Sequence, residues 1–174
     1  GAFALHAAPH CKRVIAVDIS EVMLAELREK ARQQHIRNID TVCAGFLSYE
    51  HAGEPADAVV SVVALHHLPD FWKIIALKRI NAMLKRTGKL YLFDAVFSFP
   101  LADYATHFDT WIHQMHGAAT ENMVAEVCTH IRDEFSTTDT HMDMILKEGG
   151  FTIVQKNILT PYTIEYLCSS TSRL

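Results

Sequence analysis

The feature that most constrains the fold is an apolar run that ends abruptly in a polar turn. Residues 58–65 read Ala-Val-Val-Ser-Val-Val-Ala-Leu, and His66-His67-Leu68-Pro69 follow directly. Strands of a parallel sheet are covered on both faces, so their sequences are continuously apolar rather than alternating. In an open α/β sheet, the carboxyl ends of such strands border the crevice where ligands bind. The run therefore predicts a buried parallel strand with the functional site at its end.

Strand-like and helix-like segments alternate along most of the chain. Strands are expected at residues 13–18, 40–44, 57–64, 89–94, 151–158 and 163–168, and helices at 2–8, 21–34, 70–88 and 138–148. Ser20 and Asp70 are expected to cap two of the helices, and Thr87-Gly88 to end the second of them. This alternation predicts a doubly wound, mostly parallel sheet.

The last two strands are expected to form an antiparallel hairpin. The Thr160-Pro161 turn lies in their connection. That connection is too short for a parallel crossover, which takes about a dozen residues or more.

Residues 98–136 interrupt the alternation. This segment is rich in aromatic residues and histidine and has weak helical patterning. We interpret it as one or two helices lying over the strand ends, as a lid or substrate insertion in a single domain over residues 1–174.

Composition limits the classes of partner. The chain has 49% hydrophobic residues and a formal net charge of -4, so there is no general electrostatic reason to bind nucleic acid or anionic lipid. Its four cysteines are far apart, as expected for reduced thiols. No apolar run reaches the ~20 residues of a membrane span, and no signal peptide is visible. We expect a cytoplasmic protein with a small-molecule partner and no membrane partner.

Four short motifs follow the expected elements in a fixed order. They are Val17-Asp18-Ile19-Ser20, Ala44-Gly45-Phe46, Ala64-Leu65-His66-His67-Leu68-Pro69-Asp70 and Glu148-Gly149-Gly150-Phe151. With this ordered set, the chain resembles the class I S-adenosylmethionine-dependent methyltransferases, specifically the small-molecule methyltransferase-domain group. The resemblance implies a Rossmann-like sheet and methyl transfer from S-adenosylmethionine to a small acceptor.

The resemblance also implies which residues bind the cofactor. Asp18 would accept hydrogen bonds from the two ribose hydroxyls, whose vicinal arrangement matches the paired acceptors of a carboxylate. The full implied set is Gly1, Asp18, Ile19, Met23, Gly45, Phe46, Val62 and Ala64. The alternatives are a solvated acid at Asp18 and core packing for Ile19, Met23 and Phe46.

Residues on the substrate side are predicted from their position. The candidates are His66, Asp94, His107 and Trp111. His66 either lines the substrate pocket or is structural, and His67 is expected to be structural, at the start of the following helix. Because methyl transfer depends mainly on alignment and needs a base only when the acceptor loses a proton, no catalytic residue is assigned.

The histidines predict no metal site. His66 and His67 are adjacent and should not both face one ion from a regular element, while His113 and His116 lack a recognisable third ligand.

One part of the family pattern is missing. The first strand and its Gly-x-Gly-x-Gly turn are absent, and Gly1 resembles the last glycine of that turn. The chain is therefore expected to be truncated at its amino end, which would leave unpaired backbone groups at the centre of the sheet. Three solutions are considered: upstream residues complete the fold, the strands at 13–18 and 57–64 pair directly, or a second chain lends a strand in a dimer.

Two other functions remain open. Gly1 and Asp18 also fit the spacing of a dinucleotide fingerprint, so one alternative is an NAD-dependent dehydrogenase. The other is a non-catalytic remnant that kept the methyltransferase sheet without its chemistry.

Overall fold

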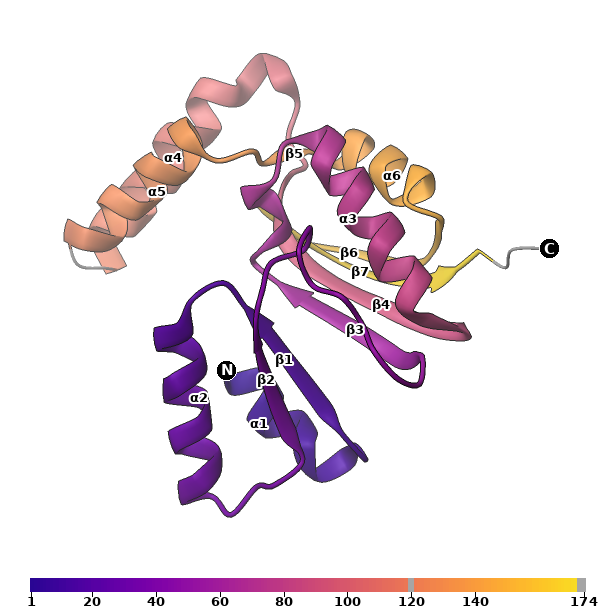
Figure 1. Ribbon diagram of the computed structural model, residues 1–174. Helices are drawn as coiled ribbons and strands as arrows, with labels where there is room; N and C mark the ends of the chain where they lie inside the picture. The colour runs from indigo at the N-terminus through magenta and orange to yellow at the C-terminus, as the bar shows by residue number, and fades with distance from the viewer. Residues whose placement is uncertain (119–120, 172–174) are drawn as a thin grey trace. The chain divides into compact units, whose positions relative to one another are not determined.

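The computed structural model describes residues 1–118 and 121–171 (Figure 1). Its contacts divide the chain into two compact units, Gly1–Ala52 and Gly53–Leu174. The expectation of one domain over residues 1–174 stays a prediction.

The first unit is built on a two-stranded parallel sheet. Its elements are α1 (Ala2–Ala7), η1 (Ala8–His10), β1 (Val14–Asp18), α2 (Glu21–Gln33) and β2 (Ile39–Cys43). The strands pair in parallel, with Asp18 opposite Cys43. Ser20 caps α2 as predicted, because its hydroxyl accepts a hydrogen bond of 3.3 Å from the Met23 amide. Leu24 and Leu27 give α2 its buried face.

The second unit contains the larger sheet. Its elements are β3 (Ala56–Val62), η2 (Leu65–His67), α3 (Asp70–Met83), β4 (Leu84–Phe97), η3 (Leu101–Asp103), α4 (Tyr104–Ala118), α5 (Glu121–Asp133), β5 (Thr137–Thr138), α6 (Asp139–Glu148), β6 (Phe151–Thr160) and β7 (Thr163–Ser170). The strand order is β3-β4-β7-β6, and β5 pairs with β4. β4 runs parallel to β3 and β5, while β6 and β7 form the predicted antiparallel hairpin. The predicted α/β class is confirmed.

One face of this sheet forms the core of the second unit. Leu90 of β4 pairs with Cys168 of β7, and Leu92 pairs with Tyr166; all four have 0% exposure. Helices α3 and α6 lie side by side over the sheet (Figure 1). Asp94 continues the same alternation and is also 0% exposed, so a carboxyl group lies within an otherwise apolar face.

The structure differs from the predicted boundaries around α3. The N-cap is Pro69, and Asp70 is the first helical residue, so the predicted capping role of Asp70 is wrong. Thr87-Gly88 lie inside β4 and do not end the helix. The chain continues as a strand here because β4 already pairs with β3 at Leu84, opposite Ala56. A bulge then shifts the register before the next pair.

Near the carboxyl end, β6 extends two residues beyond the predicted Ile158, to Thr160. The turn therefore falls at Pro161 and Tyr162 rather than at Thr160-Pro161.

The predicted insertion at residues 98–136 contains the two helices α4 and α5, which pack against each other. Residues 119–120, between them, lie outside the described part of the chain. The role of this segment as a lid stays a prediction. Among the helices that the structure describes, none combines the length and apolarity needed to cross a bilayer.

The strands fall into two sheets, with β1 in one and β3 in the other. Direct pairing of the strands at 13–18 and 57–64, one of the three solutions considered, is not among the strand pairs of the structure.

Candidate functional site

In the first unit, the structure brings together residues at the carboxyl ends of β1 and β2. Asp18 ends β1, and its Oδ1 accepts a hydrogen bond of 2.8 Å from the Ser20 amide. The Ala44 amide, just after β2, donates to the Asp18 carbonyl at 3.0 Å. A Cβ added to Gly45 would lie 3.1 Å from Ile19 Cγ2. Three predicted cofactor residues, Asp18, Ile19 and Gly45, are thus neighbours.

Apolar side chains next to Asp18 are exposed rather than packed in the core. Ile19 is 78% exposed and Met23 is 45% exposed, whereas Phe46 is half-buried. The Gly45 amide already donates to the Ser48 hydroxyl at 2.9 Å. An exposed apolar surface beside a carboxylate suits a ligand that has both a planar apolar part and hydroxyl groups.

The predicted glycine at the chain start has a packing role in the structure. A Cβ on Gly1 would lie 3.0 Å from Leu27 Cδ1 of α2. The absence of a side chain therefore allows the start of α1 to lie close to α2.

In the second unit, the end of β3 carries backbone strain. Val62 is 46% exposed and Ala64 is half-buried. Between them, Val63 adopts φ +48°, an unfavourable conformation for a β-branched residue. Its amide donates to the Phe93 carbonyl at 2.8 Å, which holds this strained turn against β4.

A buried pair of hydrogen-bonded side chains, His66 and Asp94, follows this turn. His66 in η2 is 2% exposed, and its Nδ1 lies 2.5 Å from Asp94 Oδ1. The same carboxylate accepts hydrogen bonds of 2.8 Å from the Leu65 and Ala95 amides. Three donors therefore compensate for the burial of the Asp94 carboxyl group.

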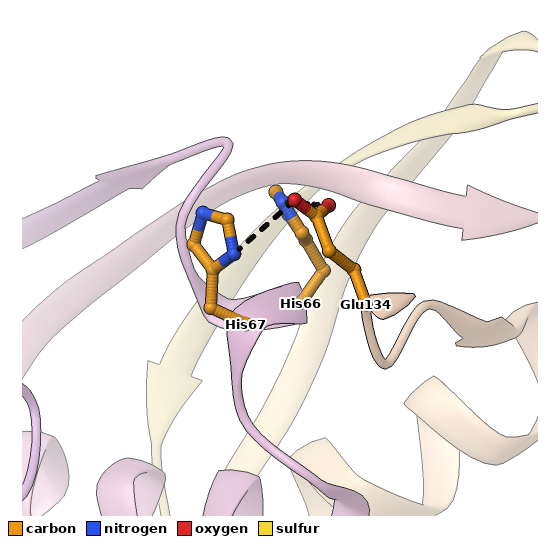
Figure 2. Close-up of side chains that lie close together, drawn as sticks. All are labelled: His66, His67 and Glu134. Carbon is orange, nitrogen blue, oxygen red and sulfur yellow. Dashed lines mark ion pairs between the residues drawn. The ribbon is translucent and has the colours of Figure 1, made fainter. Parts of the chain in front are cut away.

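Glu134, just after α5, faces three imidazole rings. Its carboxylate lies 3.1 Å from His66 Nε2 and 3.6 Å from His67 Nδ1. Figure 2 shows the three side chains gathered together. His130 Nδ1 also forms an ion pair with Glu134, and His130 Nε2 lies 2.8 Å from the Ser136 hydroxyl. Burial lowers the pKa of His130, and the negative charge of Glu134 raises it again in part.

A buried lysine holds the Glu134 segment in place. Lys73 of α3 has 0% side-chain exposure, and its Nζ lies 2.7 Å from Asp70 Oδ1. It also donates to the Phe135 carbonyl, while the Phe135 amide donates to the His66 carbonyl at 2.9 Å. Both backbone groups of Phe135 are thus anchored, and this positions the neighbouring Glu134 beside His66.

The other two predicted substrate-side residues lie in an aromatic cluster. His107 stacks on Phe99, with ring centroids 4.4 Å apart. Trp111 stacks on Tyr162, with centroids 4.5 Å apart, and meets His130 edge-on at 5.6 Å. Burial raises the pKa of Tyr162. Trp111 therefore connects the aromatic cluster to the histidines around Glu134.

Sequence reasoning missed Glu134, His130 and Lys73. The i,i+4 spacing of His130 and Glu134 was a usable signal, because such residues share one helical face. Although His66 and His67 are adjacent, the short 3-10 helix η2 brings both of them to Glu134. His113 lies on α4, and the side chain of His116 is outside what the structure describes.

Comparisons with known proteins agree with this fold. The profile of the family described as "Methyltransferase domain" matches residues 1–88. An uncharacterized methyltransferase of Geobacillus sp. (strain WCH70) is 30% identical over 148 residues, which cover 84% of this chain and 63% of the relative. Two matching curated relatives are covered over only 36% and 63% of their lengths, so the chain spans less than two thirds of either.

Solved structures share the fold at low identity. The N-methyltransferase NodS of Bradyrhizobium japonicum, in complex with S-adenosyl-L-homocysteine, matches with a TM-score of 0.65 and 20% identity, covering 99% of this chain and 74% of NodS. The magnesium protoporphyrin IX methyltransferase of Synechocystis PCC 6803, with bound S-adenosylmethionine, matches with a TM-score of 0.65 and 15% identity, covering 98% and 65%. These matches confirm the predicted Rossmann-like fold class.

Proposed function

Because this chain belongs to the methyltransferase-domain family, we propose that the protein transfers a methyl group from S-adenosylmethionine to a small-molecule acceptor. The observation that carries the proposal is the Asp18 carboxylate at the end of β1, beside the exposed side chain of Ile19 and the close approach of Gly45. The family match favours this function over the dehydrogenase alternative.

Asp18 has the chemistry to recognise a ribose. Its Oδ1 holds the Ser20 amide, and among the described residues no hydrogen bond to Oδ2 is found. A carboxylate oxygen that remains available accepts hydrogen bonds from ligand hydroxyls. Ile19 and Met23 supply apolar surface for the adenine. The other proposed cofactor residues are Gly1, Gly45, Phe46, Val62 and Ala64.

On the acceptor side, we assign His66, Asp94, His107 and Trp111 to the substrate region. S-adenosylmethionine supplies an electrophilic methyl group on a sulfonium, so the residues of the chain mainly align the acceptor and exclude water. The half-buried ring of Trp111 offers a flat apolar surface. A cytoplasmic location belongs to the same proposal.

The test compares Asp18→Asn with Asp40→Asn, an identical substitution in the same unit. The Asp40 side chain is 54% exposed and pairs with Arg13 near the amino end of β2, away from the carboxyl ends of the strands. Loss of one charged acceptor should weaken binding of S-adenosylhomocysteine by about 10- to 100-fold in Asp18→Asn, while Asp40→Asn should bind like the wild type. Calorimetry measures both.

Equal affinities in the two variants would refute the role of Asp18. A thermal shift with NAD and none with S-adenosylhomocysteine would refute the proposed function itself. Transfer of label from a labelled methyl donor to candidate acceptors then identifies the substrate.

A further inference from the structure

The cluster of His66, His67 and Glu134 has the composition of a transition-metal site. Each residue offers one ligand atom, and these atoms lie within 4.8 Å of one another (Figure 2). Two imidazoles and one carboxylate form the ligand set of many catalytic zinc sites and of non-haem iron sites.

The separations between these atoms fit a single ion. Two ligands bound at about 2.1 Å to one tetrahedral Zn²⁺ lie roughly 3.4 Å apart. Glu134 Oε2 lies 3.1 Å from His66 Nε2, and Glu134 Oε1 lies 3.6 Å from His67 Nδ1. Each imidazole thus faces a different oxygen of the same carboxylate, at a separation close to this value.

Hydrogen bonds around Asp94 fix the orientation of the His66 ring so that one ring nitrogen is available to bind an ion. Asp94 accepts from the Leu65 and Ala95 amides and faces His66 Nδ1, so we assign the imidazole proton to Nδ1. With that proton directed to Asp94, His66 Nε2 faces the Glu134 carboxylate at 3.1 Å and is the ring nitrogen available to bind an ion. A carboxylate that orients a histidine through its second nitrogen is the usual outer partner of a metal ligand.

Glu134 has a comparable outer partner. The Ser136 hydroxyl lies 2.8 Å from His130 Nε2, and His130 Nδ1 faces Glu134. The ion pair between His130 Nδ1 and Glu134 therefore holds the carboxylate in its orientation. Both the buried His66 and the half-buried Glu134 are therefore oriented by a neighbouring side chain.

We propose that His66, His67 and Glu134 bind one divalent transition-metal ion of the Zn²⁺ or Fe²⁺ type. The His67 side chain is 59% exposed, so an ion reaches the cluster from the solvent side. Three protein ligands leave at least one coordination position for an oxygen, nitrogen or sulfur of a small molecule. The ion also connects η2 to the segment after α5. This proposal replaces the expectation from sequence that no metal binds.

The test uses the full chain, stripped with a chelator and titrated with Zn²⁺ in the absence of S-adenosylmethionine. Its result is therefore independent of the proposed methyl transfer. The ligand variants are His67→Ala, at an exposed position that should not disturb folding, and Glu134→Gln. The matched controls are His113→Ala on the exposed surface of α4 and Asp133→Asn, next to Glu134 and paired with Arg132.

Calorimetry should detect about one tight Zn²⁺ per chain. Since loss of an outer partner alone weakens metal sites by about 10- to 100-fold, loss of a ligand in His67→Ala or Glu134→Gln should weaken binding by at least about 100-fold. Both controls should bind like the wild type. The visible absorption of bound Co²⁺ should disappear in the same two variants. No binding, or equal binding by ligand variants and controls, would overturn the site.

Discussion

Replacing Asp94 by Asn should strongly destabilise the second unit. Asp94 has 0% exposure and accepts from His66, Leu65 and Ala95. Asn has nearly the same shape, but an NH₂ group replaces one carboxylate oxygen. This NH₂ group is a hydrogen-bond donor, and it would face a donor of His66, Leu65 or Ala95 in place of the acceptor they now have. The remaining side-chain oxygen still accepts a hydrogen bond, but it no longer carries a negative charge.

The magnitude follows from two losses. A hydrogen bond to a charged group contributes about 1.5–3 kcal/mol, and a buried donor left without an acceptor costs about 1–3 kcal/mol. We therefore expect the free energy of unfolding to fall by about 3–5 kcal/mol. That is a large part of the ~5–15 kcal/mol of a typical domain.

Urea unfolding followed by tryptophan fluorescence measures this loss. Both tryptophans of the chain, Trp72 and Trp111, lie in Gly53–Leu174, so the signal reports on the second unit. The matched control is Asp57→Asn, because Asp57 is 85% exposed and pairs with Lys85 at the surface. The control should lose less than about 1 kcal/mol.

A loss below about 1 kcal/mol in Asp94→Asn, or equal losses in both variants, would refute the reasoning. The slope of the unfolding free energy against urea should be the same in the two variants, so that the midpoints can be compared directly.

Three further perturbations test the packing and the charges of the second unit. Gly149→Ala should cost about 1–3 kcal/mol in the same urea titration, because the new Cβ would lie 2.5 Å from Leu77 Cβ; an unchanged midpoint would contradict the close approach of α6 to α3. Burial raises the pKa of the Cys168 thiol to about 12, so a thiol reagent should label it only after unfolding, and rapid native labelling found by mass spectrometry would be inconsistent with its burial. The Asn157 amide lowers the pKa of Glu165 from 4.5, so its contribution to stability is present above about pH 4.5 and is lost as the pH falls through the lower folded value; Glu165→Gln should therefore flatten the acid limb of the stability curve, and an unaltered limb would count against this hydrogen bond.

Local patterns in the sequence were sufficient for most secondary structure. The Ser20 cap depends on a hydrogen bond to an amide only three residues away, and the β6–β7 hairpin follows from a short connection. The family motifs placed Asp18 and Gly45 at the ends of adjacent strands, where the structure has them. The prediction at Thr87-Gly88 failed because strand pairing across the sheet outweighed local turn preference.

The sequence by itself determined the strand and helix order, the α/β class and the acid at the end of β1, since each depends on periodicity or on neighbours a few residues apart. Only the tertiary structure decided that His66 meets Asp94, 28 residues away, and that Lys73 anchors Phe135, 62 residues away. Such partners have no local signature. They are selected because a buried charge is stable only where packing brings it a partner, and that depends on how the helices and the sheet come together.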